Sequence, residues 1–268
     1  MLGAAPMTMQ IPGALIDSLR AARHVMVLSG AGISAESGLA TFRTPQTGLW
    51  ERFRPEELAT PQAFRRDPAL VWGWYEWRRM QVMRASPNPA HRAVADLQSL
   101  VPELTLVTQN VDDLHERAGS ERVAHLHGRI GQPYCESCRL PHALGPEIPD
   151  EPENGRSLDP PSCLHCKGNV RPGVVWFGES LPTSEWEAAQ DAAARCDAFF
   201  CIGTSSLVQP AASLINVAMH AGAITIQINP NPTGLESQIT YEFPFAAGTV
   251  LPAIVEGLRV SVAGPHKV

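Results

Sequence analysis

The stretch VMVLSGAGISA, residues 25–35, decides the fold. Four apolar residues are followed at once by Ser29, Gly30 and Gly32, the order expected of a buried strand that ends in a tight turn and leads into a helix. The turn fits the pattern GxGxxA, in which glycines let backbone N–H groups approach a pyrophosphate at the start of a helix. Alone, this pattern is equally compatible with a plain tight turn.

Three more apolar runs end in small or polar residues, and helical patterns such as Ser184–Arg195 and Pro210–His220 lie among them. Alternating strands and helices are typical of a parallel sheet covered on both faces. We therefore predict an α/β fold with an open, doubly wound, Rossmann-like sheet whose ligand site lies beyond the carboxyl ends of the strands. The four predicted strands are His24–Leu28, Leu104–Val107, Ala198–Ile202 and Ala223–Ile228.

Composition excludes several classes of protein. The 268 residues are 44% hydrophobic and 18% charged, as in globular domains, and the formal net charge is -6 with no long basic run. Nucleic acid is therefore not an expected partner. No stretch of about 18 apolar residues is present, and Met1–Gln10 lacks the features of a secretory signal, so we expect no membrane partner and a cytoplasmic location. The sequence does not determine the oligomeric state, and a monomer is favoured.

Two excursions interrupt the predicted core. Residues 45–92 form a helical, Trp-rich insertion, and residues 132–173 form a lobe rich in cysteine and proline. The predicted sheet domain thus comprises residues 11–131 and 174–260, with tails at 1–10 and 261–268.

The Cys-rich lobe carries two CxxC pairs separated by 24 residues. In a reducing compartment such pairs indicate a metal before a disulfide, and four thiolates complete a tetrahedral zinc shell without an open position. We predict one structural zinc ion, with disulfides or a redox dithiol as the alternatives. The ligands are Cys135, Cys138, Cys163 and Cys166, whereas His125, His142 and His165 are interpreted as non-ligands.

Hydride transfer is disfavoured by the segment after the Gly-rich turn. An ordinary dehydrogenase has a second strand that ends in an acidic residue about 20 positions later. Here residues 50–55 read WERFRP and the chain then turns helical. A nucleotide site with another use for the ribose is indicated instead.

Six motifs occur together in one order, and in that set the chain resembles the sirtuins, NAD-dependent protein-lysine deacylases. The resemblance runs over about residues 25–258 and includes the CxxC pairs. The motifs are Gly30–Gly38, Phe42-Arg43, Thr108–His115, His127-Gly128, Gly203–Ser205 and Asn229.

The resemblance implies a reaction between NAD and acylated lysine-containing proteins. The acyl oxygen attacks the anomeric carbon of the nicotinamide ribose, nicotinamide leaves, and the acyl group ends on ADP-ribose. His127 is then the general base, for which an imidazole suits because its unperturbed pKa lies near neutrality. Asn110 and Asp112 hold the nicotinamide end and its ribose. Without the resemblance, a packed or surface histidine and an Asx turn at the strand end would be favoured.

The same resemblance implies the other cofactor contacts. Gln109 touches the ribose, Ser34 and Arg43 the phosphate region, and Phe42 shields the reacting carbon from water. The residues at the ends of the last two predicted strands, together with Ala247, are implied to contact the adenosine half of NAD. The full expected set is Gly30, Ala31, Gly32, Ser34, Phe42, Arg43, Gln109, Asn110, Val111, Asp112, Gly203, Thr204, Ser205, Asn229, Pro230, Asn231 and Ala247.

Tyr75 and Arg78 are three residues apart, so on a helix they share one face. A guanidinium fork and a phenol together can bind a carboxylate. By spacing alone, packed aromatics with Arg78 either paired to Glu76 or exposed to solvent would be favoured. The Tyr75–Arg78 pair resembles the Tyr-x-x-Arg motif of the class III sirtuins, which are desuccinylases and demalonylases. Thr41 also matches that class. Succinyl or malonyl removal, with weaker deacetylation, is therefore expected.

In the family, the substrate peptide lies as an added strand between two edges of the protein. The resemblance places these edges at Val175–Glu179 and Ser206–Val208. The expected substrate contacts are Val175, Phe177 and Gly178. Ala40, where sirtuins usually carry proline, puts cofactor affinity in doubt. Two alternative functions remain open: the chain is an NAD-dependent ADP-ribosyltransferase, or it is a non-catalytic NAD-sensing scaffold.

Overall fold

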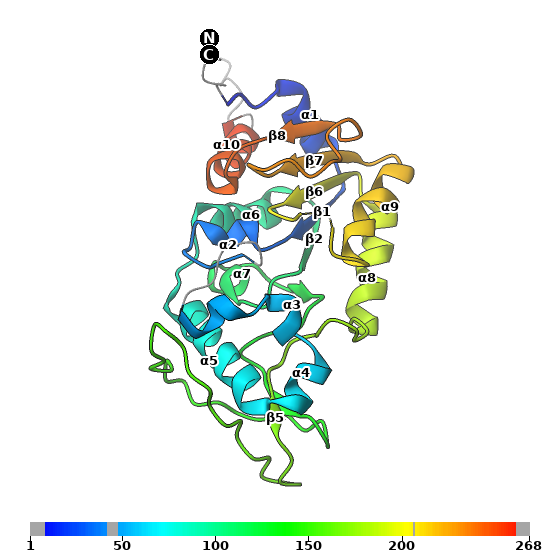
Figure 1. The fold of residues 1–268 in the computed structure, drawn as a ribbon. Coiled ribbons are helices and arrows are strands. Elements are labelled where there is room, and N and C mark those ends of the chain that lie inside the picture. The colour runs from blue at the N-terminus through cyan, green and yellow to red at the C-terminus, as the bar shows by residue number, and fades with distance from the viewer. Residues whose placement is uncertain (1–8, 42–47, 206, 261–268) are drawn as a thin grey trace, which may run out of the picture.

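The computed structural model describes residues 9–41, 48–205 and 207–260. Its main sheet has six strands in the order β3-β2-β1-β6-β7-β8, and all of them run parallel. Figure 1 shows this sheet between two groups of helices. The predicted fold class, a parallel Rossmann-like α/β sheet, is confirmed.

The four predicted strands form the centre of the sheet. They are β1 (His24–Ser29), β2 (Glu103–Thr108), β6 (Ala198–Ile202) and β7 (Ile224–Ile228). The edges are β3 (Ala124–His125) and β8 (Tyr241–Phe243), which are too short to show an apolar run. In register, Val25 pairs with Leu104 on one side and with Ala198 on the other.

Each face of the sheet packs against its own helices because side chains alternate along a strand. Val25 and Val27 of β1 join a core with α1 (Gly13–Ala21), α6 (Pro89–Leu100) and α10 (Ala247–Val260). Met26 and Leu28 join a second core with α8 (Thr183–Arg195), the 3-10 turn η2 (Ala211–Ser213) and α9 (Leu214–His220). In Figure 1, α6 and α10 lie to the left of the strands and α8 and α9 to the right.

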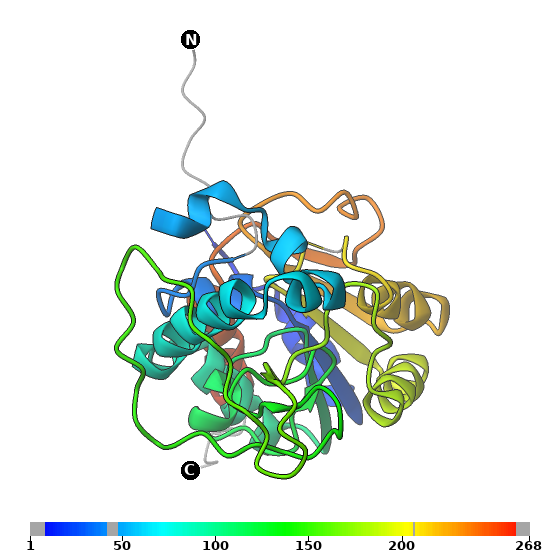
Figure 2. The ribbon, with the colours of Figure 1, turned by 60° about the horizontal axis from the view of Figure 1, so that its bottom comes forward.

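A second group of elements lies at one end of the sheet. It contains η1 (Gly48–Arg52), α3 (Pro55–Leu58), α4 (Pro61–Arg66), α5 (Pro68–Arg84) and a two-stranded antiparallel ribbon of β4 (Tyr134–Cys135) and β5 (Val170–Arg171). Helices α3 to α5 each begin with proline, which is favoured at the first helical position. Figure 2, viewed from that end, shows the cyan helices and green loops in front of the strands.

These helices have a core of their own in which Trp74, Tyr75 and Phe64 pack with Trp176, a residue 101 positions after Tyr75. Two short helices, α2 (Gly32–Ala35) and α7 (Leu114–Arg117), follow β1 and β2 at their carboxyl ends. Within the described residues, no helix combines the length and apolarity needed to cross a bilayer.

Candidate functional site

The Gly-rich turn after β1 meets the turn after β6, the neighbouring strand at which the sheet order reverses. A Cβ atom on Gly32 would lie 2.6 Å from Gly203 Cα, and Gly203 itself has φ 60°. The N–H groups of Gly30 and Gly32 donate to Ile202 O and Gly203 O. The glycines are therefore needed for the close packing of the two strand ends, whether or not this turn also contacts a ligand.

Ser34 joins two predicted site residues in one buried network. Its hydroxyl donates to Asp112 Oδ2 over 3.0 Å and accepts from Asn110 Nδ2 over 3.1 Å. Asp112 Oδ1 also accepts from the Leu114 N–H. Burial raises the pKa of Asp112 above its ordinary value, against the hydrogen bonds from Leu114 and Ser34, which lower it. The structure thus brings Ser34, Asn110 and Asp112 together from two strand tips.

His91 is a member of this network that the sequence did not indicate. It lies on α6, is fully buried, and has Nε2 3.4 Å from Ser34 Oγ and Nδ1 3.3 Å from the Asn88 N–H. Since the backbone N–H donates to Nδ1, Nε2 carries the proton and donates to Ser34. No motif surrounds His91, so only the packing of α6 against α2 reveals its role.

His127 follows β3 and has Nδ1 2.9 Å from the carbonyl oxygen of Gln109. A carbonyl only accepts, so Nδ1 carries the proton and Nε2 keeps its lone pair. Burial lowers the pKa of His127 below its ordinary 6.5, and the bond to Gln109 partly opposes this. His127 is therefore held as a neutral imidazole with a basic nitrogen, which is the state that a general base requires.

Gln109 also reaches the next strand tip. Its side-chain Nε2 donates to Thr204 Oγ1 over 3.0 Å, while Asn229 Nδ2 donates to the Thr204 carbonyl over 2.8 Å. Asn229 Oδ1 in turn accepts from the Asn231 N–H. Hydrogen bonds thereby connect the residues that follow β2, β6 and β7.

The remaining predicted cofactor residues occupy the same edge or lie outside the described part of the chain. Ala31 and Ser205 are partly exposed, Pro230 is exposed, and Ala247 is buried at the start of α10. Val111 accepts the N–H of Ile130 through its carbonyl. Phe42 and Arg43 lie outside the described residues.

Tyr75 and Arg78 both lie on α5. Tyr75 is buried beside Trp74 and Trp176, whereas Arg78 is partly buried with its guanidinium 5.0 Å from the centre of the Trp74 ring. Glu76 pairs with Arg79 at 2.8 Å, so the alternative pairing of Glu76 with Arg78 is not what the structure shows.

Arg78 interacts electrostatically with one of the predicted cofactor residues, Asp112. Burial lowers the pKa of Arg78, while Tyr75 and the carboxylate of Asp112 act in the opposite direction. Burial likewise raises the pKa of Tyr75, so this phenol stays protonated. Arg78 is thus a partly buried side chain whose charged form is favoured by Tyr75 and by Asp112.

The predicted substrate edge Val175–Glu179 does not form a strand: Val174 makes only an isolated bridge with Gly128, and the chain then turns, with the Glu179 N–H donating to Trp176 O. Part of its backbone is already engaged. Val175 and Phe177 donate their N–H groups to His127 O and Ala59 O. Gly178 has φ 87°. Apolar side chains are exposed on this segment and on the opposite predicted edge, namely Phe177 (43% exposed), Leu207 (66%) and Val208 (37%). Ser206 lies outside the described residues.

The four predicted zinc ligands converge. Their sulfur atoms all lie within 4.8 Å of one another, with Cys135 3.4 Å from Cys166 and Cys138 3.6 Å from Cys163. A disulfide needs about 2 Å between sulfurs, whereas four thiolates about 2.3 Å from a zinc ion are roughly 3.8 Å apart. The group therefore fits tetrahedral zinc.

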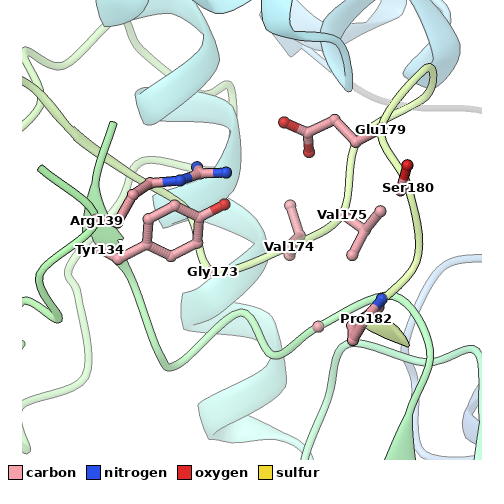
Figure 3. A pocket seen from close by; sticks show the side chains of 9 residues that line it. Tyr134, Arg139, Gly173, Val174, Val175, Glu179, Ser180 and Pro182 are labelled. Atoms are coloured by element: carbon pink, nitrogen blue, oxygen red, sulfur yellow. The ribbon is translucent and has the colours of Figure 1, made fainter. Parts of the chain in front are cut away.

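A cavity of about 540 Å³ lies beside the strand tips and not among them. Figure 3 shows Tyr134 and Arg139 of the Cys-rich lobe on one side and Val174, Val175 and Pro182 on the other. Gly128, next to His127, also lines it. Among the predicted site residues, only Val175 contributes to its lining.

Comparison with known proteins places these features in a family. The profile of the Sir2 family matches residues 30–210. A protein of Methylococcus capsulatus named NAD-dependent protein deacylase is 54% identical over 94% of this chain and 99% of its own length. NAD-dependent protein deacylase 1 of Pseudomonas aeruginosa is 50% identical over 90% and 97%. A crystal structure of a Sir2 homologue in complex with NAD superposes with a TM-score of 0.85 at 43% identity, covering 94% of this chain and 96% of the other.

Proposed function

The chain belongs to the Sir2 family, and from that membership we propose that it is an NAD-dependent protein-lysine deacylase that prefers acyl groups ending in a carboxylate, such as succinyl and malonyl. Acetyl groups are weaker substrates. The observation that carries the activity is His127, whose basic Nε2 is defined by the bond from Nδ1 to Gln109 O and lies on the same sheet edge as Ser34, Asn110 and Asp112.

The groups at the strand tips fit a dinucleotide. Amide, hydroxyl and carboxylate groups of the kinds that bind a carboxamide and ribose hydroxyls come together there. We assign the nicotinamide and its ribose to Asn110, Asp112 and Gln109, the phosphates to the turn from Gly30 to Ser34, and the adenosine to Gly203–Ser205, Asn229–Asn231 and Ala247. Bound NAD supplies an anomeric carbon that carries nicotinamide as a leaving group.

The residues of the chain supply orientation and proton transfer. Ser34 holds the Asp112 carboxylate and the Asn110 amide in fixed positions, which is how side chains lower the entropic part of a barrier. His127 Nε2 accepts the proton of a ribose hydroxyl, and burial keeps this imidazole neutral. The four cysteines would hold zinc with no open position, so the metal's role is to fix the lobe.

Selection of a carboxylate is assigned to Tyr75 and Arg78. The guanidinium provides the charge and a fork of donors, and the protonated phenol provides a neutral donor. The carboxylate of Asp112 interacts electrostatically with Arg78, which supports assigning this pair and the cofactor residues to one substrate. The lysine-bearing peptide is assigned to Val175, Phe177 and Gly178, whose neighbourhood exposes apolar side chains.

A panel of acetyl, malonyl, succinyl and glutaryl peptides incubated with NAD tests the proposal. Nicotinamide release with free lysine and O-acyl-ADP-ribose, fastest for the acidic acyl groups, is the expected result. An ADP-ribosylated peptide would support the ADP-ribosyltransferase instead. An intact NAD pool with every peptide would support a non-catalytic NAD-sensing scaffold.

A further inference from the structure

Trp176, between the Cys-rich lobe and the sheet domain, is held at three points. Its backbone N–H donates to Glu179 Oε2 over 2.8 Å, its ring faces the Arg171 guanidinium at 3.5 Å, and its Nε1 donates to Tyr75 Oη over 3.1 Å. The side chain is 2% exposed. An indole fixed in this way can direct its N–H only toward Tyr75.

This contact determines what the Tyr75 hydroxyl can do. An indole N–H is a donor only, so Tyr75 Oη must accept from it. The O–H of Tyr75 is therefore left to donate, and the described residues show no acceptor for it. A buried hydroxyl hydrogen without an acceptor is costly, which indicates that a ligand atom completes the bond.

Arg171 braces Trp176 from the other side. It is 1% exposed and lies on β5, where it binds both Glu179 oxygens at 2.6 and 2.8 Å. Because Glu179 also accepts the Trp176 N–H, one ion pair fixes both the backbone and the ring of this tryptophan. The indole is therefore rigid before any substrate arrives.

We propose that Trp176 is a positioning residue for acyl selectivity: its indole N–H orients the Tyr75 phenol so that the O–H donates to the terminal carboxylate of the acyl chain. The inference rests on the proposed function, which assigns that carboxylate to Tyr75 and Arg78. Trp176 itself touches no part of the acyl group in this scheme. It acts through Tyr75, and the consequence is measurable as a preference between acyl groups.

A double-mutant cycle tests this role. Trp176→Phe, Tyr75→Phe and the double variant are compared with the wild-type protein by the ratio of kcat/KM for succinyl and acetyl peptides of one sequence. Trp176→Phe should lower the ratio by about three- to tenfold, the net effect of one neutral hydrogen bond. In the Tyr75→Phe background the same substitution should leave the ratio unchanged, since no hydroxyl remains to orient.

A control separates orientation from packing. Phe64 contacts the Trp176 ring at 5.3 Å between centroids and donates no hydrogen bond from its side chain, so Phe64→Leu should lower Tm without changing the ratio. If Trp176→Phe does not fold, incorporation of benzothienylalanine at position 176 keeps the ring size and removes only the N–H, and the same cycle is run with it.

The outcomes are distinguishable. An unchanged ratio after loss of the indole N–H, or an equal drop in the Tyr75→Phe background, overturns the positioning role alone. A wild-type protein without preference for succinyl, or a ratio insensitive to Tyr75→Phe, contradicts the proposed acyl selectivity and this inference with it.

Discussion

The rings of His91 and His115 lie edge to face with their centroids 5.0 Å apart, and His91 also contacts Ser34 of α2. His115 is 2% exposed, with Nε2 2.9 Å from Ser29 Oγ. Burial lowers the pKa of His91 to about 4 and that of His115 to about 3, and the two rings cannot both be charged at this separation without strong repulsion.

This pair predicts acid sensitivity of stability. Both pKa values in the folded protein lie below the ordinary 6.5, so the unfolded chain binds more protons as the pH falls. The stabilisation is complete above pH 6.5 and is lost on the way down toward pH 4. Each group contributes a slope of up to about 1.4 kcal/mol per pH unit. Denaturant unfolding between pH 6.5 and 5 should show this slope, and His91→Gln should make it shallower. Equal slopes in both proteins would mean that His91 does not titrate as the structure indicates.

The cysteine group predicts a linked loss of metal and stability. Cys163→Ser should lower the bound zinc from about one ion per chain toward none, because three thiolates no longer complete the shell. Tm should fall with it, by about 2–4 °C for each kcal/mol lost. Metal analysis and a thermal scan of the same sample provide the check, with Cys196→Ser as the control outside the group. A wild-type protein that is fully stable without zinc would refute the assignment.

Arg78 predicts a selective effect on acyl groups. Arg78→Met keeps the length of the side chain and removes a charge-assisted hydrogen bond, so kcat/KM for a succinyl peptide should fall by roughly 10- to 150-fold. An acetyl peptide has no carboxylate to lose and should change little. Arg84→Met on the same helix, where the side chain is exposed, serves as the control. Equal losses of kcat/KM for both peptides would show that Arg78 does not bind the carboxylate of the acyl group.

The sequence predicted the central strands and the polar residues at their ends because both depend on local patterns. Apolar runs with β-branched residues gave β1, β2, β6 and β7, and polar residues directly after them marked one edge of a parallel sheet. The CxxC spacing similarly brought four sulfurs to one point. Within each strand and within each CxxC pair, the determining residues are neighbours along the chain.

Contacts that depend on packing could not be predicted in this way. His91 reaches Ser34 across 57 positions, and Trp176 reaches Tyr75 across 101. Nothing in the local sequence distinguishes either residue from an ordinary core side chain. The two-residue strand β3, which precedes His127, shows no periodicity. The supporting residues of the site therefore became visible only from the arrangement of α5 and α6.

His127 predicts a large loss of activity without a loss of fold. His127→Ala removes the basic nitrogen, and general-base catalysis is worth about 10²–10⁴ in rate. The side chain is only partly buried, so unfolding by denaturant should be little affected. Nicotinamide release is the measurement, and His220→Ala, an exposed histidine at the end of α9, is the control. Wild-type turnover by His127→Ala would remove this residue from the mechanism.

The pH dependence of the reaction provides an independent test of the same imidazole. Nε2 accepts a proton only while His127 is neutral, so kcat/KM should fall in acid as His127 becomes protonated. Burial lowers the pKa of His127, and the bond from Nδ1 to Gln109 O only partly offsets this, so the midpoint of the acid limb must lie below 6.5. kcat/KM should therefore rise from acid pH to a plateau above that midpoint and stay there until another group titrates. Steady-state kinetics with a succinyl peptide at saturating NAD locate the midpoint, and a value above 6.5 would show that the charged imidazole is stabilised, contrary to the buried environment seen here.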